Sequence, residues 1–332
     1  MAKTELPEEA PQQSDEQPSE RPAEETVQIP LIGVELPKVA VPWIFGGILA
    51  ALILGWSFLS GLPSVWFDDE GYYSHGVLVP FLTLYILYSR RDKIREQSIG
   101  VSMGGMVVLI LGLLVVVAAK RIDNLSLASG GFILSLIGAV YFCFGKRVGK
   151  LCAGPLLFLV FMMPVLGFLI DNTTNPLQLL STKVASAILS IFGYNPHIPP
   201  AYQTLIHLDS YELNVGGPCS GFKLILSLTA FTTFFIMISN LGLFKNLLLL
   251  LVINPVLALF INGLRIMLIG VVGQGAVNNP DAWWAQFLHK YGEDAGMVFH
   301  DWSGYITLIV CFVILHFIVQ ALERRKPDVA QN

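Results

Sequence analysis

The sequence predicts an all-α polytopic membrane protein with about eight transmembrane helices. Of its 332 residues, 54% are hydrophobic and only 13% are charged. Soluble domains have roughly 45–50% apolar and about 25% charged residues. The mean hydropathy is +0.64, and several uncharged stretches reach the roughly 20 residues that cross a ~30 Å hydrocarbon core as a helix. Lipid is therefore the expected solvent for most of the chain.

Apolar runs along the chain locate the candidate spans. They cover residues 42–60, 76–89, 101–119, 125–144, 151–170, 219–238, 247–271 and 302–321, and the run 76–89 is short. We expect one transmembrane domain over residues 42–322. Residues 1–36 are rich in Glu, Pro, Gln and Ser, a composition that predicts a disordered acidic tail. Residues 323–332 form a short C-terminal tail.

Lysine and arginine in the short loops predict the orientation, because they concentrate on the cytoplasmic side. Under eight crossings, eleven of them fall on the side of the termini and four on the other. The eleven are Arg90, Arg91, Lys93, Arg95, Lys146, Arg147, Lys150, Lys245, Arg324, Arg325 and Lys326, and the four are Lys120, Arg121, Lys183 and Lys290. We therefore expect a multi-pass protein of the cytoplasmic (inner) membrane with both termini in the cytoplasm.

This topology places residues 61–75, 171–218 and 272–301 outside the cytoplasm. The second of these contains an amphipathic run over residues 177–192 and a strand-like alternation over residues 204–215. The sequence thus predicts a small extracytoplasmic segment of amphipathic helix and short strands.

Other classes of function lack support in the composition. The net charge of -4 comes with no basic stripe, so no nucleic-acid partner is expected. The four cysteines form no CxxC pair and no Cys/His spacing that suits a metal, so neither a metal nor another cofactor is expected.

Cys219 is the candidate nucleophile. It follows Gly216-Gly217-Pro218 where the outer segment meets the sixth apolar run. Proline suits a first helical turn, and unpaired backbone amides at a helix N-terminus favour a thiolate and can bind an oxyanion. The alternative is a glycine-rich turn that contains an incidental small residue.

Arg265 lies within the seventh run, six residues before its outer end at Val271. An arginine inside a span is costly unless it faces a polar cavity or partner. Asn254, Asn262 and Arg265 fall on one helical arc and form a polar stripe. The alternative is an arginine that snorkels to the interface.

His300 lies at the outer start of the eighth run, in Phe299-His300-Asp301-Trp302. A histidine there can exchange protons near neutral pH, although an interface histidine is often structural. Three segments distant in sequence nonetheless bring Cys219, Arg265 and His300 to the same outer level, which favours a shared site.

Four further residues are accessory candidates. Asn262 belongs to the polar stripe, and Ser220 follows the nucleophile directly. His75 reaches the outer level, with either a structural or a substrate-positioning role. Lys223 lies one turn below Cys219 and favours the thiolate if it points inward; the alternative is that it snorkels outward.

Together these motifs resemble the exosortase/archaeosortase family of membrane transpeptidases. The resemblance covers roughly residues 66–315 and includes Tyr73-Ser74-His75-Gly76 with Tyr85, Pro176-Leu177-Gln178, Val215 to Gly221, Asn262 to Ile266, and His300. One departure is Gly216-Gly217-Pro218, where a more ordinary helix-start sequence is common in the family.

The resemblance implies a cysteine protease or transpeptidase that works at the extracytoplasmic face. Cys219 would be the nucleophile, His300 the general acid and base, and Arg265 the group that stabilises the oxyanion or holds the substrate. The implied partners are membrane proteins that end in a short motif such as Pro-Glu-Pro, a transmembrane helix and a basic tail, with components of exopolysaccharide synthesis as further candidates. Two other classes stay open from the residues alone: a transporter or channel subunit, and a noncatalytic scaffold for exopolysaccharide export.

Overall fold

The computed structural model describes residues 26–29, 34–37, 53, 55–56, 59–68, 71–164, 167–292 and 294–324. The elements up to the middle of the chain are β1 Thr26–Ile29, β2 Val34–Pro37, α2 Leu62–Trp66, η1 Ser74–Val77, α3 Val79–Ser89, α4 Arg91–Arg95, α5 Met103–Arg121, α6 Leu125–Phe158 and η2 Leu159–Met162. Those that follow are α7 Gly167–Ile191, β3 Leu205–His207, β4 Glu212–Asn214, η3 Gly217–Cys219, α8 Phe222–Ile238, α9 Leu243–Leu248, the π-helical turn η4 Leu249–Ile253, α10 Asn254–Asn278, α11 Trp283–His289 and α12 Ala295–Arg324.

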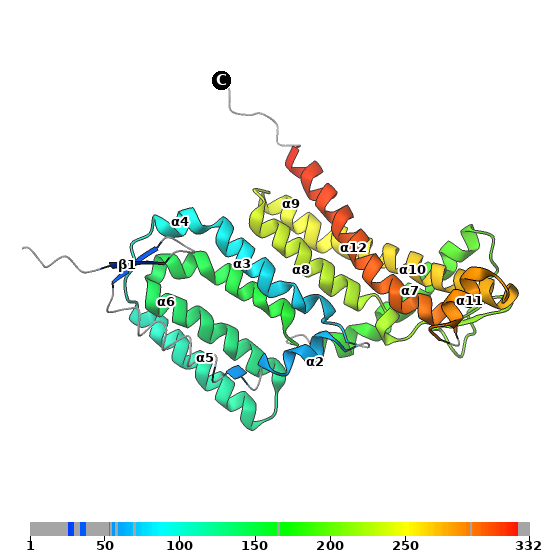
Figure 1. Cartoon of the computed structure of the whole chain (residues 1–332), viewed down its shortest axis with the longest axis horizontal. Coiled ribbons are helices and arrows are strands. Elements are labelled where there is room, and N and C mark those ends of the chain that lie inside the picture. The colour runs from blue at the N-terminus through cyan, green and yellow to red at the C-terminus, as the bar shows by residue number, and fades with distance from the viewer. Residues whose placement is uncertain are drawn as a thin grey trace, which may run out of the picture.

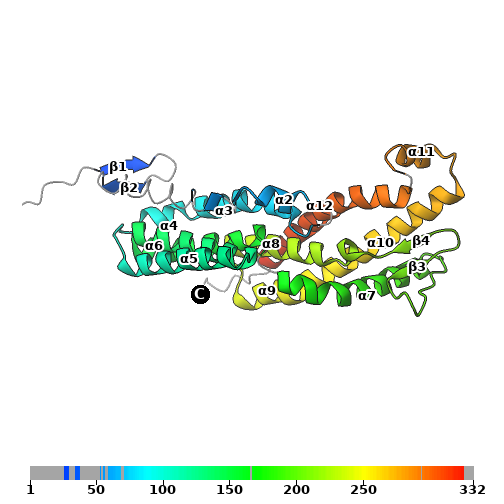
Figure 2. The same cartoon turned by 90° about the horizontal axis from the view of Figure 1, so that it is seen from below.

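The helices form an elongated bundle. Helices α5 and α6 lie at one end, and the β3–β4 hairpin and α11 lie at the other (Figures 1 and 2). Helix α8 lies between α3 and α12 near the middle (Figure 1), and α7, α10 and α12 continue from there toward the hairpin end (Figure 2). The bundle is built almost entirely from helices, as the apolar runs predict.

Helix α6 consists of two arms that meet at Gly145. The backbone there has φ 86° and ψ 173°, which breaks the helix, and glycine adopts such a positive φ at little cost. Val140 and Cys152 belong to one packed cluster, whereas in a continuous helix they would be about 18 Å apart along the axis. The chain therefore reverses, and the two arms correspond to the run 125–144 and to the first part of the run 151–170.

Among the residues that the structure describes, four helical stretches are long and apolar enough to cross a membrane: Met103–Arg121, Leu125–Met162, Leu243–Asn278 and Ala295–Arg324. Helices Val79–Ser89 and Phe222–Ile238 are apolar but shorter. A membrane protein built of apolar helices is thus supported. The count of eight crossings, the orientation and the extracytoplasmic location of the strands stay predictions.

Two elements differ from the sequence-based expectation. Residues 26–29 and 34–37 form an antiparallel hairpin within the tail that we expected to be disordered, and the apolar residues that alternate in Val27, Ile29, Val34 and Leu36 suit strands. The other residues of that tail, and most of the run 42–60, lie outside the described residues.

Helix α7 is the second difference. It unites the end of the run 151–170 with the amphipathic run 177–192 in one helix, Gly167–Ile191, which includes Pro176. The sequence predicts these two runs as separate segments. Helix α7 packs along α10, and such tertiary packing overrides weak local preference.

Two apolar clusters fix the place of the candidate site. The larger joins α3, α6, α8, α10 and α12, with Phe158, Leu228, Leu249 and Leu315 among its fully buried members. The second joins α7, the β3–β4 hairpin and α10, and Cys219 packs against it. Cys219 therefore lies where the β3–β4 hairpin meets the helical bundle.

Candidate active site

Cys219 ends a 3-10 turn, Gly217–Cys219, directly before α8. Its backbone N–H donates to the carbonyl of Gly216 at 3.0 Å. Gly221 has φ 86° and caps the helix that starts at Phe222, and this left-handed conformation favours glycine. The unusual Gly-Gly-Pro segment thus forms a compact turn that presents the thiol at the start of α8.

Side chains from two neighbouring helices hold this turn by its carbonyl groups. Asn262 of α10 donates to the carbonyl of Cys219 at 2.9 Å and to the hydroxyl of Ser181 at 3.1 Å. Ser181 of α7 donates to the carbonyl of Ser220 at 2.8 Å. Asn262, Ser181 and Ser220 are all buried, so these hydrogen bonds restrict the position of Cys219.

A further support comes from Gln178 of α7, whose amide donates to the carbonyl of Val215 at 2.7 Å. We did not predict Ser181 or Gln178 as site residues. Both belong to the amphipathic run 177–192, where polar residues are expected on one face in any case. Only the Pro176-Leu177-Gln178 segment of the family resemblance pointed to this region.

Cys219 and His300 are in hydrogen-bonding contact. The Sγ atom lies 2.7 Å from Nε2 of His300. The imidazole extends from the second turn of α12, and both residues are partly exposed. A thiol beside an imidazole that can take its proton is the arrangement of an activated cysteine nucleophile.

Arg265 of α10 binds the segment that carries the imidazole. Its Nη2 donates to the backbone carbonyl of His300 at 2.9 Å, and its Nε donates to the hydroxyl of Ser303 at 3.1 Å. Ser303 also donates to the carbonyl of His300 at 2.9 Å. The guanidinium therefore fixes the first turns of α12 against α10, and it faces the same cavity as the imidazole.

The start of α12 is held by a second contact. Asp294 accepts backbone hydrogen bonds from Gly296 at 2.8 Å and Met297 at 3.2 Å, which makes it an N-cap. The hydroxyl of Tyr211, in the turn between β3 and β4, donates to the same carboxylate at 3.0 Å. Burial, and then the bond to Asp294, raise the pKa of Tyr211. The hairpin thus anchors the helix that carries His300.

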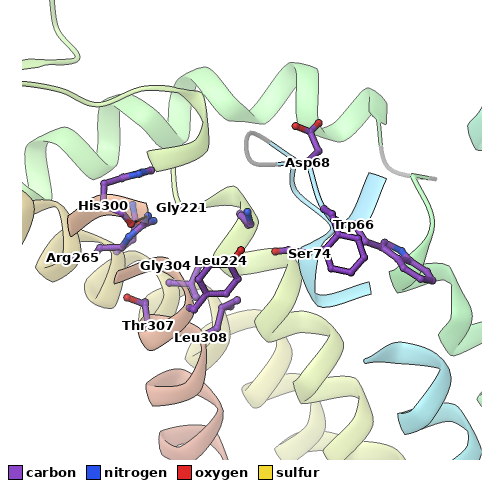
Figure 3. Close-up of a pocket in the computed structure, with 14 residues that line it drawn as sticks. Trp66, Asp68, Ser74, Gly221, Leu224, Arg265, His300, Gly304, Thr307 and Leu308 are labelled. Carbon is purple, nitrogen blue, oxygen red and sulfur yellow. Dashed lines mark hydrogen bonds between the residues drawn. The ribbon is translucent and has the colours of Figure 1, made fainter. Parts of the chain in front are cut away.

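A cavity of about 330 Å³ opens beside these groups. It is lined by Trp66, Phe67, Asp68, Ser74, Gly221, Lys223, Leu224, Asn262, Arg265, His300, Gly304, Tyr305, Thr307 and Leu308. In Figure 3, Arg265 and His300 lie on one side, Trp66 and Asp68 lie on the other, and Gly221 lies between them. Polar and apolar side chains both face it, as suits a peptide.

Of the other candidates, Lys223 and Asn262 line this cavity, whereas His75 does not. His75 is 3% exposed and its Nδ1 lies 3.0 Å from the hydroxyl of Ser227. The pKa of His75 is lowered from 6.5 to about 4, mainly because the side chain is buried. A hydrogen bond with the backbone of Phe161 raises this pKa, and the positive charge of Lys223 lowers it. His75 is therefore buried outside this cavity, and its structural and substrate-positioning roles both stay predictions. The hydroxyl of Ser220 accepts a hydrogen bond from the backbone N–H of Phe222 at 3.2 Å and so contacts the first residue of α8.

In the described part of the chain, no cluster of three or more His, Cys, Asp or Glu residues could hold a metal ion. The thiol of Cys219, the imidazole of His300 and the guanidinium of Arg265 lie together at this site.

The sequence profile of the family described as Transmembrane exosortase matches residues 66–317. No curated protein and no solved structure matches the chain. The matched segment spans most of the chain and contains every residue of the site described above. The chain therefore belongs to the transmembrane exosortase family.

Proposed function

We propose that the chain is a membrane-embedded cysteine protease or transpeptidase that cleaves a C-terminal sorting signal through a thioacyl intermediate on Cys219. The observation that carries this proposal is the 2.7 Å approach of the Cys219 Sγ to the His300 Nε2. Family membership suggests a transpeptidase-type role in the membrane, and the contact between Cys219 and His300 supports these two residues as the reacting pair.

In the first step, Nε2 of His300 takes the thiol proton as Sγ of Cys219 attacks the scissile carbonyl carbon. The resulting oxyanion requires positive charge or N–H donors nearby. Arg265 lines the cavity beside His300, and its guanidinium stays protonated, so it serves as an electrostatic stabiliser and not as a base.

In the second step, the protonated imidazole gives its proton to the departing amine as the C–N bond breaks. The acyl group is then a thioester on Cys219. His300 next takes a proton from the acceptor, an amine or water, whose attack on the thioester carbon releases the thiol. The new C-terminus is transferred to an amine or hydrolysed by water.

The substrates we propose are membrane proteins that end in a short motif such as Pro-Glu-Pro, a transmembrane helix and a basic tail. Lys223, Arg265 and Asp68 all line the cavity, and its two cations suit an acidic side chain in the motif. By the distribution of Lys and Arg in the loops, the cavity opens on the outer side of the cytoplasmic membrane, with both termini inside.

The test replaces the thiol in the full chain. Cys219→Ala should abolish cleavage of a reporter that carries Pro-Glu-Pro, an apolar helix and an arginine-rich tail, because the thiol that attacks the scissile carbonyl is lost. Membrane insertion and thermal stability should be unchanged. Cys143, a partly exposed free cysteine on α6, gives the matched control, since Cys143→Ala should cleave normally. Undiminished cleavage by Cys219→Ala would overturn the proposal and leave a transporter or scaffold as the alternatives.

A further inference from the structure

A second cavity, of about 430 Å³, lies between α3 and α12 and is lined almost entirely by apolar side chains. We call it the lateral groove and define it by Leu78, Phe81, Leu82, Phe231, Ile309 and Phe312. Helix α3 supplies one wall, α12 the other, and Phe231 of α8 the floor. Figure 1 shows α8 between these two helices.

The open side of the groove is suited to lipid and not to water. Phe81 and Ile309 are 67% and 65% exposed, and they belong to helices that are apolar along their length. Within a bilayer, such a groove is accessible to membrane-embedded groups. A segment of polypeptide that lies there must satisfy its own backbone hydrogen bonds, which requires it to be helical.

The groove continues into the cavity of the candidate active site. Ser74, Tyr305 and Leu308 line both cavities. On α12, His300 and Phe312 are twelve residues apart, about 18 Å along the helix axis. A chain that lies in the groove therefore extends at one end toward the cavity lined by His300, whose Nε2 contacts the thiol of Cys219.

The spacing of the lining residues suits a helix as the occupant. Leu78, Phe81 and Leu82 follow each other at i, i+3 and i+4. On α12 the lining residues at positions 305, 308, 309 and 312 repeat at i, i+3, i+4 and i+7. Two such ridges with a hollow between them are the surface against which a third helix packs.

We infer that the lateral groove seats the apolar transmembrane helix of the polypeptide substrate and so places the peptide bond next to that helix at Cys219. The inference rests on the proposed function and adds the surface that selects the substrate. The groove binds the helix, whereas the cavity beside His300 binds the residues to be cut.

Photo-crosslinking tests this seat in the full chain. A benzophenone amino acid replaces Phe81 or Ile309 in the Cys219→Ala background, in membranes that hold the reporter described above. The matched control position is Leu114 on α5, an apolar side chain of similar exposure, 59%. The groove positions should form roughly tenfold more reporter adduct than Leu114, as a modest binding preference gives.

Cleavage of the same reporter by the otherwise unaltered chain separates the two proposals. If the reporter is cleaved but crosslinks no more at the groove than at Leu114, the groove proposal fails and the proposed function stands. If the groove crosslinks the reporter strongly but the reporter is not cleaved, the seat stands and the proposed function fails. Adducts with phospholipid alone would overturn the seat in favour of an acyl chain.

A groove-filling variant provides an independent measurement. Ile309→Trp should raise the reporter concentration needed for half-maximal cleavage by roughly tenfold, while alkylation of Cys219 by a small maleimide proceeds at the normal rate. Leu114→Trp should change neither quantity. Equal cleavage kinetics for Ile309→Trp and the unaltered chain would contradict the seat.

Discussion

At the scale of single residues, the site depends on how a thiol and an imidazole from distant segments are held together. The sequence predicts Cys219, Arg265 and His300 as site residues because each is an unusual amino acid for its position in or beside a predicted transmembrane helix. It does not predict Ser181 or Gln178, because a serine or glutamine in an amphipathic helix carries no distinguishing signal. Their partners are carbonyl groups 37 or more residues away, which only the fold brings close.

Asn262→Ala should lower kcat for reporter cleavage by about 10-fold or more, because small misplacements of a reacting group are costly. The carbonyl of Cys219 and the hydroxyl of Ser181 lose their shared donor, whereas the reporter's helix still binds, so KM should change little. The measurement is steady-state cleavage together with the rate of Cys219 alkylation. Asn279→Ala, at an exposed asparagine bonded within its own turn, is the control. A normal kcat for Asn262→Ala would contradict the positioning role.

The buried imidazole of His75 should make stability depend on pH. Its pKa is lowered from 6.5 to about 4 in the folded chain, so between these values the unfolded chain binds the proton and the folded chain does not. Acidification through this window should therefore destabilise the fold, by on the order of 1 kcal/mol per pH unit. The midpoint of thermal unfolding should therefore differ less between pH 7.5 and pH 5 for His75→Gln than for the unaltered chain. An identical pH effect in both proteins would contradict this assignment.

At the scale of elements, the apolar runs predict where most helices lie, but not where they bend or join. Gly145 shows what hydropathy does not predict. Hydropathy predicts two runs joined by a basic loop, whereas the chain reverses at this single residue through its backbone φ and ψ angles. Pro176 illustrates the converse, since a local breaking signal lies inside a helix that tertiary packing maintains. Helix α10 also continues to Asn278, beyond the end of its apolar run.

The contact between α5 and the first arm of α6 predicts a position-specific effect of a single methyl group. At Gly138 an added Cβ would lie 2.3 Å from the backbone nitrogen of Leu109, whereas at Gly130 it would meet no atom within 4 Å. Gly138→Ala should destabilise the protein by about 1–3 kcal/mol, because two backbones must separate. Gly130→Ala should be neutral or slightly stabilising through helix propensity. Unfolding midpoints in detergent measure both, and equal midpoints would contradict this packing.

At the scale of the whole molecule, the profile match over residues 66–317 encloses the thiol, the imidazole, the guanidinium and the lateral groove. The sequence predicts the class of membrane protein and the family, because hydropathy and short motifs suffice for both. The eight crossings and the orientation of the cavity stay predictions, which rest on hydropathy and on the distribution of Lys and Arg. Helices α10 and α12 and the turn before α8 meet only through tertiary packing, which explains why the sequence gives candidate residues and not their distances.

The central claim is that Cys219 forms a covalent thioester with the substrate. It is tested by adding hydroxylamine to membranes that contain the full chain and the reporter, and by analysing the reporter's new C-terminus by mass spectrometry. The account predicts a C-terminal hydroxamate at the cleavage site, formed by the unaltered chain and by Cys143→Ala but not by Cys219→Ala. Cleavage that yields no hydroxamate, or a hydroxamate that persists in Cys219→Ala, would contradict it.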